Sequence, residues 1–183
     1  RGPLIFPGDT GSSVKSAGGQ ASYYFSQPFY NISGMLTVPE GEIAVTGQAW
    51  LDREWSSQPL GEDQTGWDWF SLSFDSGDKM MGFLLRQSGG TSYSSATWIT
   101  PDGATQAFPD GAFRATPSDT HNTADREVPV TWRVQLAEKG VDVTVTAINP
   151  NAWMATSVPY WEGPVTVEGS HHGVGYLEMT GYE

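Results

Sequence analysis

The densest group of side chains able to do chemistry lies in two neighbouring segments, residues 47–58 and 66–70, which together hold four tryptophans and several charged groups. Charged groups beside large aromatic faces are partly desolvated, and desolvation shifts their pKa values. In an extended chain Asp52 and Glu54 point to the same side. Two nearby carboxylates can divide the work of a general acid and a general base. We therefore predict Asp52, Glu54 and Asp68 as candidate catalytic residues.

The same charges also allow a purely structural interpretation. Arg53 lies between the two carboxylates and could pair with one of them, while the tryptophans close the end of a barrel. Ion-pair networks of this kind perturb pKa values as well. Both interpretations stay open from the sequence.

Asp68 stands in a run of alternating residues that places it on the same face as Phe70 and Leu72. An unpaired buried carboxylate makes the free energy of folding less favourable by roughly 1–5 kcal/mol, so it needs a partner. Arg86, at the end of the next expected strand, is the predicted one.

Aromatic and acidic residues meet again near the end of the chain, in residues 159–163 and 175–182. Alternation separates Tyr176 and Glu178 from the apolar Leu177, so one face of this last strand is polar and could line a ligand-filled barrel interior. The predicted ligand-binding residues are Trp50, Arg53, Trp55, Trp67, Trp69, Arg86, Tyr160, Trp161, Tyr176 and Glu178.

No metal site is predicted. His171 and His172 are adjacent, so on an extended chain they point to opposite faces, which does not suit chelation by both. The only other histidine, His121, lies in a polar stretch, and no serine stands in a Gly-x-Ser-x-Gly elbow.

Strand alternation dominates the rest of the chain, and helical periodicity is nearly absent. The short strands are separated by glycine, proline and aspartate turns, which is typical of a β-barrel or sandwich. Residues 1–19 are predicted to be a linker or arm, residues 20–183 the folded domain, and residues 115–126 its longest polar loop. The predicted strands are 21–27, 29–38, 43–50, 67–75, 80–87, 92–100, 104–108, 127–137, 141–148, 164–168 and 173–181.

The composition narrows the function classes. A net charge of −12 with scattered cations argues against nucleic acid as a partner. The chain has no cysteine, which excludes disulfide and thiolate chemistry. No run of residues is long and apolar enough for a transmembrane helix. The chain begins with arginine, which suggests a piece of a longer protein.

Several motifs, in order, resemble the AttH/CrtC-like family of lipocalin-like proteins. They are Ala21–Ser26, Val45–Trp55, Gly66–Phe70 and Gly175–Tyr182. The resemblance implies an all-β fold, a lipocalin-like antiparallel barrel of about 8–10 strands. Family members are about twice this length and contain two such barrels, so it also implies an N-terminal lipocalin-like domain, or a separate chain, as partner. The exported location of many relatives favours a periplasmic or secreted protein.

The same resemblance implies an apolar, isoprenoid-like or lipid-like small molecule as ligand, with no cofactor. Its hydratases add water to an alkene: an acid protonates the double bond, aromatic faces stabilise the cation, and a base activates water. Asp52 and Trp55 match the hydratase motif. Arg53 stands where a histidine is expected, and the apolar run 82–85 stands where a tyrosine and an aspartate are expected. The resemblance thus leaves three alternatives: a hydratase or lyase, a non-catalytic binding or structural domain, and a secreted hydrolase.

Overall fold

A computed structural model describes residues 2–57, 60–124 and 126–182 of the chain. Strands make up most of these residues, and one short 3-10 helix, η1 (Ala137–Lys139), follows β9. The strands are β1 (Ser12–Val14), β2 (Ala21–Val38), β3 (Gly41–Trp55), β4 (Gln64–Phe74), β5 (Lys79–Gln87), β6 (Ser92–Ile99), β7 (Thr105–Phe108), β8 (Phe113–Thr123), β9 (Arg126–Leu136), β10 (Val141–Ala147), β11 (Trp153–Met154), β12 (Tyr160–Gly169) and β13 (Gly173–Met179).

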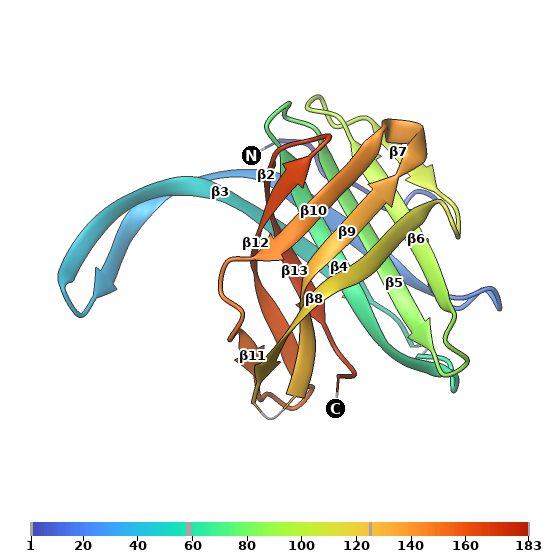
Figure 1. The fold of residues 1–183 in the computed structure, drawn as a ribbon. Coiled ribbons are helices and arrows are strands. Elements are labelled where there is room, and N and C mark those ends of the chain that lie inside the picture. The colour runs from blue at the N-terminus through green and yellow to red at the C-terminus, as the bar shows by residue number, and fades with distance from the viewer. Residues whose placement is uncertain (1, 58–59, 125, 183) are drawn as a thin grey trace.

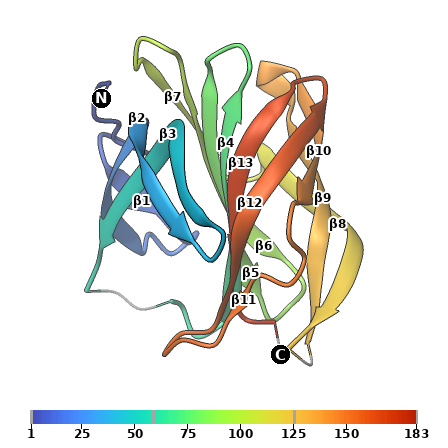
Figure 2. The same ribbon diagram turned by 90° about the vertical axis from the view of Figure 1, so that its left-hand side faces the viewer.

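The strands form two antiparallel sheets. The larger has ten strands in the order β7-β6-β5-β4-β13-β12-β10-β9-β8, with β11 paired to β12, and it curls into a half-barrel (Figure 1). The smaller has three strands in the order β1-β2-β3 and lies beside the large sheet (Figure 2). The predicted all-β, lipocalin-like fold is confirmed.

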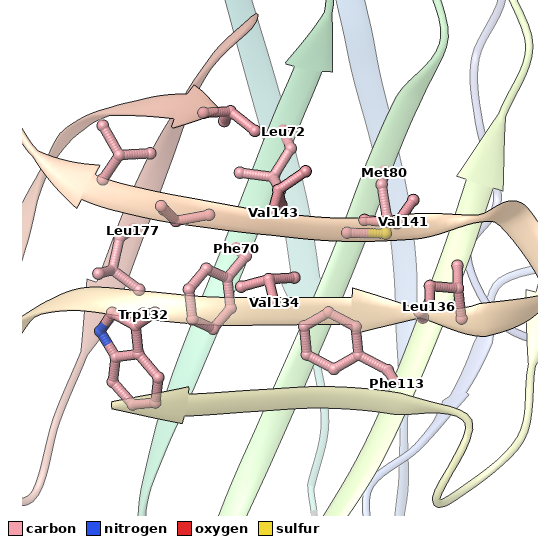
Figure 3. Packing of buried hydrophobic residues seen from close by; sticks show 14 of the residues in the cluster. Phe70, Leu72, Met80, Phe113, Trp132, Val134, Leu136, Val141, Val143 and Leu177 are labelled. Atoms are coloured by element: carbon pink, nitrogen blue, oxygen red, sulfur yellow. The ribbon is translucent and has the colours of Figure 1, made fainter. Parts of the chain in front are cut away.

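Side chains fill the interior of the half-barrel (Figure 3). Phe70 of β4 lies between Phe113 and Trp132, with ring centroids 5.9 and 5.5 Å away. Gly82 of β5 makes room for this arrangement, because a Cβ there would come within 2.6 Å of the Phe113 ring. The interior is therefore a packed hydrophobic core.

A second, smaller core lies on the opposite face of the large sheet. Tyr24 of β2 packs there against Met81, Phe83 and Leu85 of β5. Because β5 is covered on both faces, residues 79–85 are all buried, and the strand reads as a continuous apolar run rather than an alternating one. This core holds the small sheet against the barrel.

The outer half of the β2–β3 hairpin, residues 31–48, extends away from the barrel as an arm (Figure 1). This hairpin arm is a different segment from the linker or arm predicted at residues 1–19. The two strands stay paired to Val38 and Gly41, and a register shift between Gln27 and Tyr30 marks the place where the arm leaves the body.

Two local predictions differ from the structure. The polar loop predicted at 115–126 is wrong, because most of it forms β8, which pairs with β9 at the edge of the sheet. The strands predicted at 21–27 and 29–38 are one strand with a bulge. Residues 12–14, within the predicted arm 1–19, form β1 and pair with β2. Among the described residues, no helix has the length and apolar character that crossing a bilayer requires.

Candidate functional site

A cavity of about 860 Å³ lies between the small sheet and the outer face of the barrel. Strand alternation puts Trp67 and Trp69 of β4 on this face and Asp68 and Phe70 on the core face. From β3, Trp50, Asp52 and Glu54 line the cavity, and from β13, Tyr176 and Glu178 do so. The volume is in the range of small-molecule sites. The lining combines aromatic side chains with polar and charged ones.

Asp52 faces this aromatic lining. Its Oδ1 accepts hydrogen bonds from the Ser26 hydroxyl and from the Trp50 indole, the latter with an Nε1–Oδ1 distance of 2.9 Å. Burial raises the pKa of Asp52, while hydrogen bonds from Ser26, Trp50 and Tyr24 act in the opposite direction. A raised pKa is a change in the direction that a general acid requires.

Three further carboxylates, Glu54, Glu162 and Glu178, share the cavity with Asp52. Glu54 accepts a hydrogen bond from Ser22 and forms an ion pair with Lys15, with an Nζ–Oε1 distance of 2.7 Å. Glu178 accepts a hydrogen bond from the Trp67 indole at 2.7 Å, and burial raises its pKa. The cavity therefore combines carboxylates in different environments with indole faces.

Asp68 lies outside the cavity, on the core face of β4, with 1% of its surface exposed. It pairs with Arg86, as the sequence predicted, and accepts a hydrogen bond from the Tyr182 hydroxyl at 2.9 Å. Arg86 also donates to the Thr180 carbonyl. This cluster ties the end of the chain to β4 and β5.

The other predicted residues are divided between cavity, rim and core. Arg53 lies between Asp52 and Glu54 on β3 and is exposed. Trp55 borders the cavity, and its ring contacts Tyr23. Tyr160 packs edge-on against Trp67, with centroids 6.2 Å apart. Trp161 is fully buried in the barrel core. Of the thirteen predicted site residues, the cavity brings together Trp50, Asp52, Glu54, Trp55, Trp67, Trp69, Tyr176 and Glu178.

Sequence reasoning missed several lining residues. Tyr24 and Lys15 come from segments whose position depends on the folding back of the small sheet. Phe83 looks like ordinary core in an apolar run, and Lys79 looks like a solvated residue after a turn. Strand alternation from Trp69 could have found Ser71 and Ser73.

Within the described residues, no group of three or more histidine, aspartate or glutamate side chains could hold a metal ion.

The half-barrel has a lipocalin-like fold, with a packed interior and a cavity on its outer face. The family model described as AttH-like matches residues 1–182, so the chain belongs to the AttH-like family. The family resemblance predicted from the motifs is confirmed. A comparison with curated protein sequences found no match.

Two solved structures are similar. A protein assigned to AttH from Nitrosomonas europaea has 34% sequence identity and a TM-score of 0.91, with 100% of this chain and 60% of that chain covered. Kievitone hydratase from Nectria haematococca has 21% identity and a TM-score of 0.80, with 98% of this chain and 58% of that chain covered, and it supports the fold alone. The chain thus spans less than two thirds of either relative.

Proposed function

We propose that the cavity between the small sheet and the barrel binds an apolar, unsaturated small molecule and that Asp52 protonates its double bond as the first step of hydration. The observation that carries this proposal is the position of Asp52: a carboxyl with a pKa raised by burial, lining a cavity that also contains the indole rings of Trp50, Trp67 and Trp69. Kievitone hydratase, a protein of the same fold, is named for a hydration.

In this mechanism the Asp52 carboxyl transfers its proton to one alkene carbon, and the positive charge forms on the other. The faces of Trp50 and Trp69 lie where they can stabilise that charge by cation–π attraction. Water adds to the cation and gives a proton to a carboxylate, for which Glu54, ion-paired with Lys15, is the candidate. The net reaction is the addition of one water molecule, and the proton returns to Asp52 for the next cycle.

The experiment measures binding and reaction separately. Quenching of tryptophan fluorescence by a series of prenyl alcohols reports binding, and mass spectrometry in ¹⁸O-labelled water reports the gain of one labelled oxygen. Asp52→Asn should retain binding and lose at least about 100-fold in rate. Glu168→Gln, at an exposed position of β12, is the matched control. Turnover at the wild-type rate by Asp52→Asn would contradict the assignment of the acid.

A non-catalytic binding domain is the second candidate, and one observation favours it. Both Ser26 and Trp50 donate to the same Asp52 oxygen, as they would if Asp52 joined β2 to β3. A non-catalytic domain should bind the ligand without forming labelled product. Asp52→Ala should then reduce the free energy of unfolding by more than it reduces the free energy of ligand binding.

For the partner, we propose that the arm packs on a second domain, an N-terminal lipocalin-like domain on the same or a separate chain. One face of the arm is wholly apolar, with Ile32, Leu36 and Ile43 each about half exposed. A lone two-stranded ribbon is marginally stable in water, so an apolar face on it favours a covering partner. Both solved relatives contain chain outside the match.

Hydrogen exchange tests this partner. The probe is the unmatched part of the Nitrosomonas protein, added as a separate polypeptide. It should slow exchange in residues 31–48, and Leu36→Glu should abolish the effect, whereas Thr37→Glu on the opposite face should not. A stable dimer of this chain with a protected arm would instead make a second copy the partner.

A further inference from the structure

The cavity is electrically polarised along β4. Its carboxylates are Asp52, Glu54, Glu162 and Glu178, and the Trp67 indole donates a hydrogen bond to Glu178. At the other end the lining includes Ser71, Ser73 and Lys79, together with Gln48 and Val174. The hydration proposed above needs the acidic, aromatic end and gives no role to the cationic one.

Lys79 is a buried cation without a counter-charge. Its exposed fraction is 5%, and its Nζ donates to the Ser73 hydroxyl at 2.8 Å and lies 5.3 Å from the Phe29 ring centroid. Within residues 2–57, 60–124 and 126–182 it forms no ion pair, whereas Lys15 in the same cavity pairs with Glu54. Burial lowers the pKa of Lys79, and no carboxylate acts in the opposite direction. Isolated buried charges are costly, so a position of this kind favours an anionic ligand.

The surroundings of Lys79 can accommodate a head group. Ser73 and Ser71 add hydroxyl donors beside the ammonium, and an ammonium with hydroxyls is a donor set suited to a carboxylate. Lys79, Ser73 and Gln48 also border an adjoining cavity of about 730 Å³. The cationic end therefore has space beyond the main cavity for a polar group and its water.

We propose that Lys79, with Ser71 and Ser73, binds the carboxylate of an amphipathic unsaturated acid whose apolar body lies along Trp69 towards Asp52. This rests on the proposed function, because it names the substrate class of the same cavity. Tyr24 lines the same cavity as Asp52 and Trp69, and both residues influence the pKa of its hydroxyl. Trp69 and Ser73 are four residues apart on β4, so the carboxylate lies roughly 13 Å from the double bond that Asp52 protonates.

The test compares farnesoic acid with farnesol, an acid and an alcohol with the same unsaturated chain, in the fluorescence assay on the whole chain. The wild type should bind the acid about 10- to 100-fold more tightly than the alcohol. Lys79→Met should reduce this ratio to near one, and Lys79→Arg should restore most of it. Lys139→Met, a lysine on the barrel rim beside Trp98, is the control and should retain the preference.

Thermal unfolding shows whether each variant is folded. Lys79→Met removes an unpaired charge, so it should leave the unliganded protein at least as stable. Farnesoic acid should raise the Tm of the wild type and of Lys79→Arg, but not of Lys79→Met. Equal binding of acid and alcohol by the wild type would overturn the head-group site and leave the proposed function intact. Failure of both compounds to bind would count against both proposals.

Discussion

The two faces of β4 differ in their surroundings, because one packs into the barrel core and the other lines a cavity. Phe70 and Leu72 point into a barrel interior that is completely filled, and both are fully buried. Trp69 and Ser71, their neighbours in sequence, point into a cavity of about 860 Å³. In this lipocalin-like fold the ligand-sized space is outside the barrel, and the small sheet β1–β3 forms its second wall. Substitutions on the two faces should therefore affect different properties.

The largest effect is expected on the filled face. Phe70→Ala should lower the free energy of unfolding by about 3–5 kcal/mol, because it removes a ring packed between Phe113 and Trp132 and leaves a void that these rings cannot close. Urea unfolding followed by circular dichroism measures it. A loss below about 1 kcal/mol would mean that the interior is loosely packed.

The next effect concerns the ion pair between Asp68 and Arg86 on the filled face. Arg86→Met leaves the Asp68 carboxylate buried without its cation and should destabilise the protein by about 3 kcal/mol near neutral pH. Without Arg86 the folded-state pKa of Asp68 rises further above its unfolded value, so the deficit should shrink as pH falls through that pKa. The double variant Asp68→Leu/Arg86→Met should recover much of the loss, and a pH-independent deficit would contradict this explanation.

On the open face, Trp69→Ala should cost only about 1–2 kcal/mol, because the half-buried indole borders an empty space. The same substitution should weaken binding of farnesol at least about tenfold, since it removes an aromatic wall of the site. Phe70→Ala, one residue away, is the matched control: measured well below its unfolding midpoint, it should bind normally. A reversal of these two outcomes would show that the ligand enters the barrel interior.

The sequence was sufficient for the fold class and for part of the site. Alternation identified most strands, put Asp52 and Glu54 on one face, and predicted the pairing of Asp68 with Arg86, all of which depend on local geometry or neighbouring strands. The polar strand β8 was missed because it lies at the sheet edge and residues 114–122 are mostly exposed, so no alternation marks it.

The location of the cavity could not be predicted, because it depends on where the small sheet lies relative to the barrel. Sequence pattern alone did not show that Tyr24 would cover β5, and this contact is what makes both faces of β5 buried. For the same reason Lys79 looked like a surface residue. The register of β4 places Asp68, a predicted catalytic residue, on the filled face and outside the cavity.

The smallest effect is expected at the acid itself, and its sign distinguishes a functional carboxyl from a structural one. Burial raises the folded-state pKa of Asp52 above its unfolded value, so this group stabilises the fold at low pH, and that contribution is lost as pH rises through the folded pKa. Asp52→Asn removes the ionisation, and its amide oxygen can still accept from Ser26 and Trp50. We expect the Tm to rise by about 2–4 °C at about pH 7 and to match the wild type at about pH 4. A lower Tm at neutral pH, measured by scanning calorimetry, would instead show that Asp52 is retained to hold β2 and β3 together.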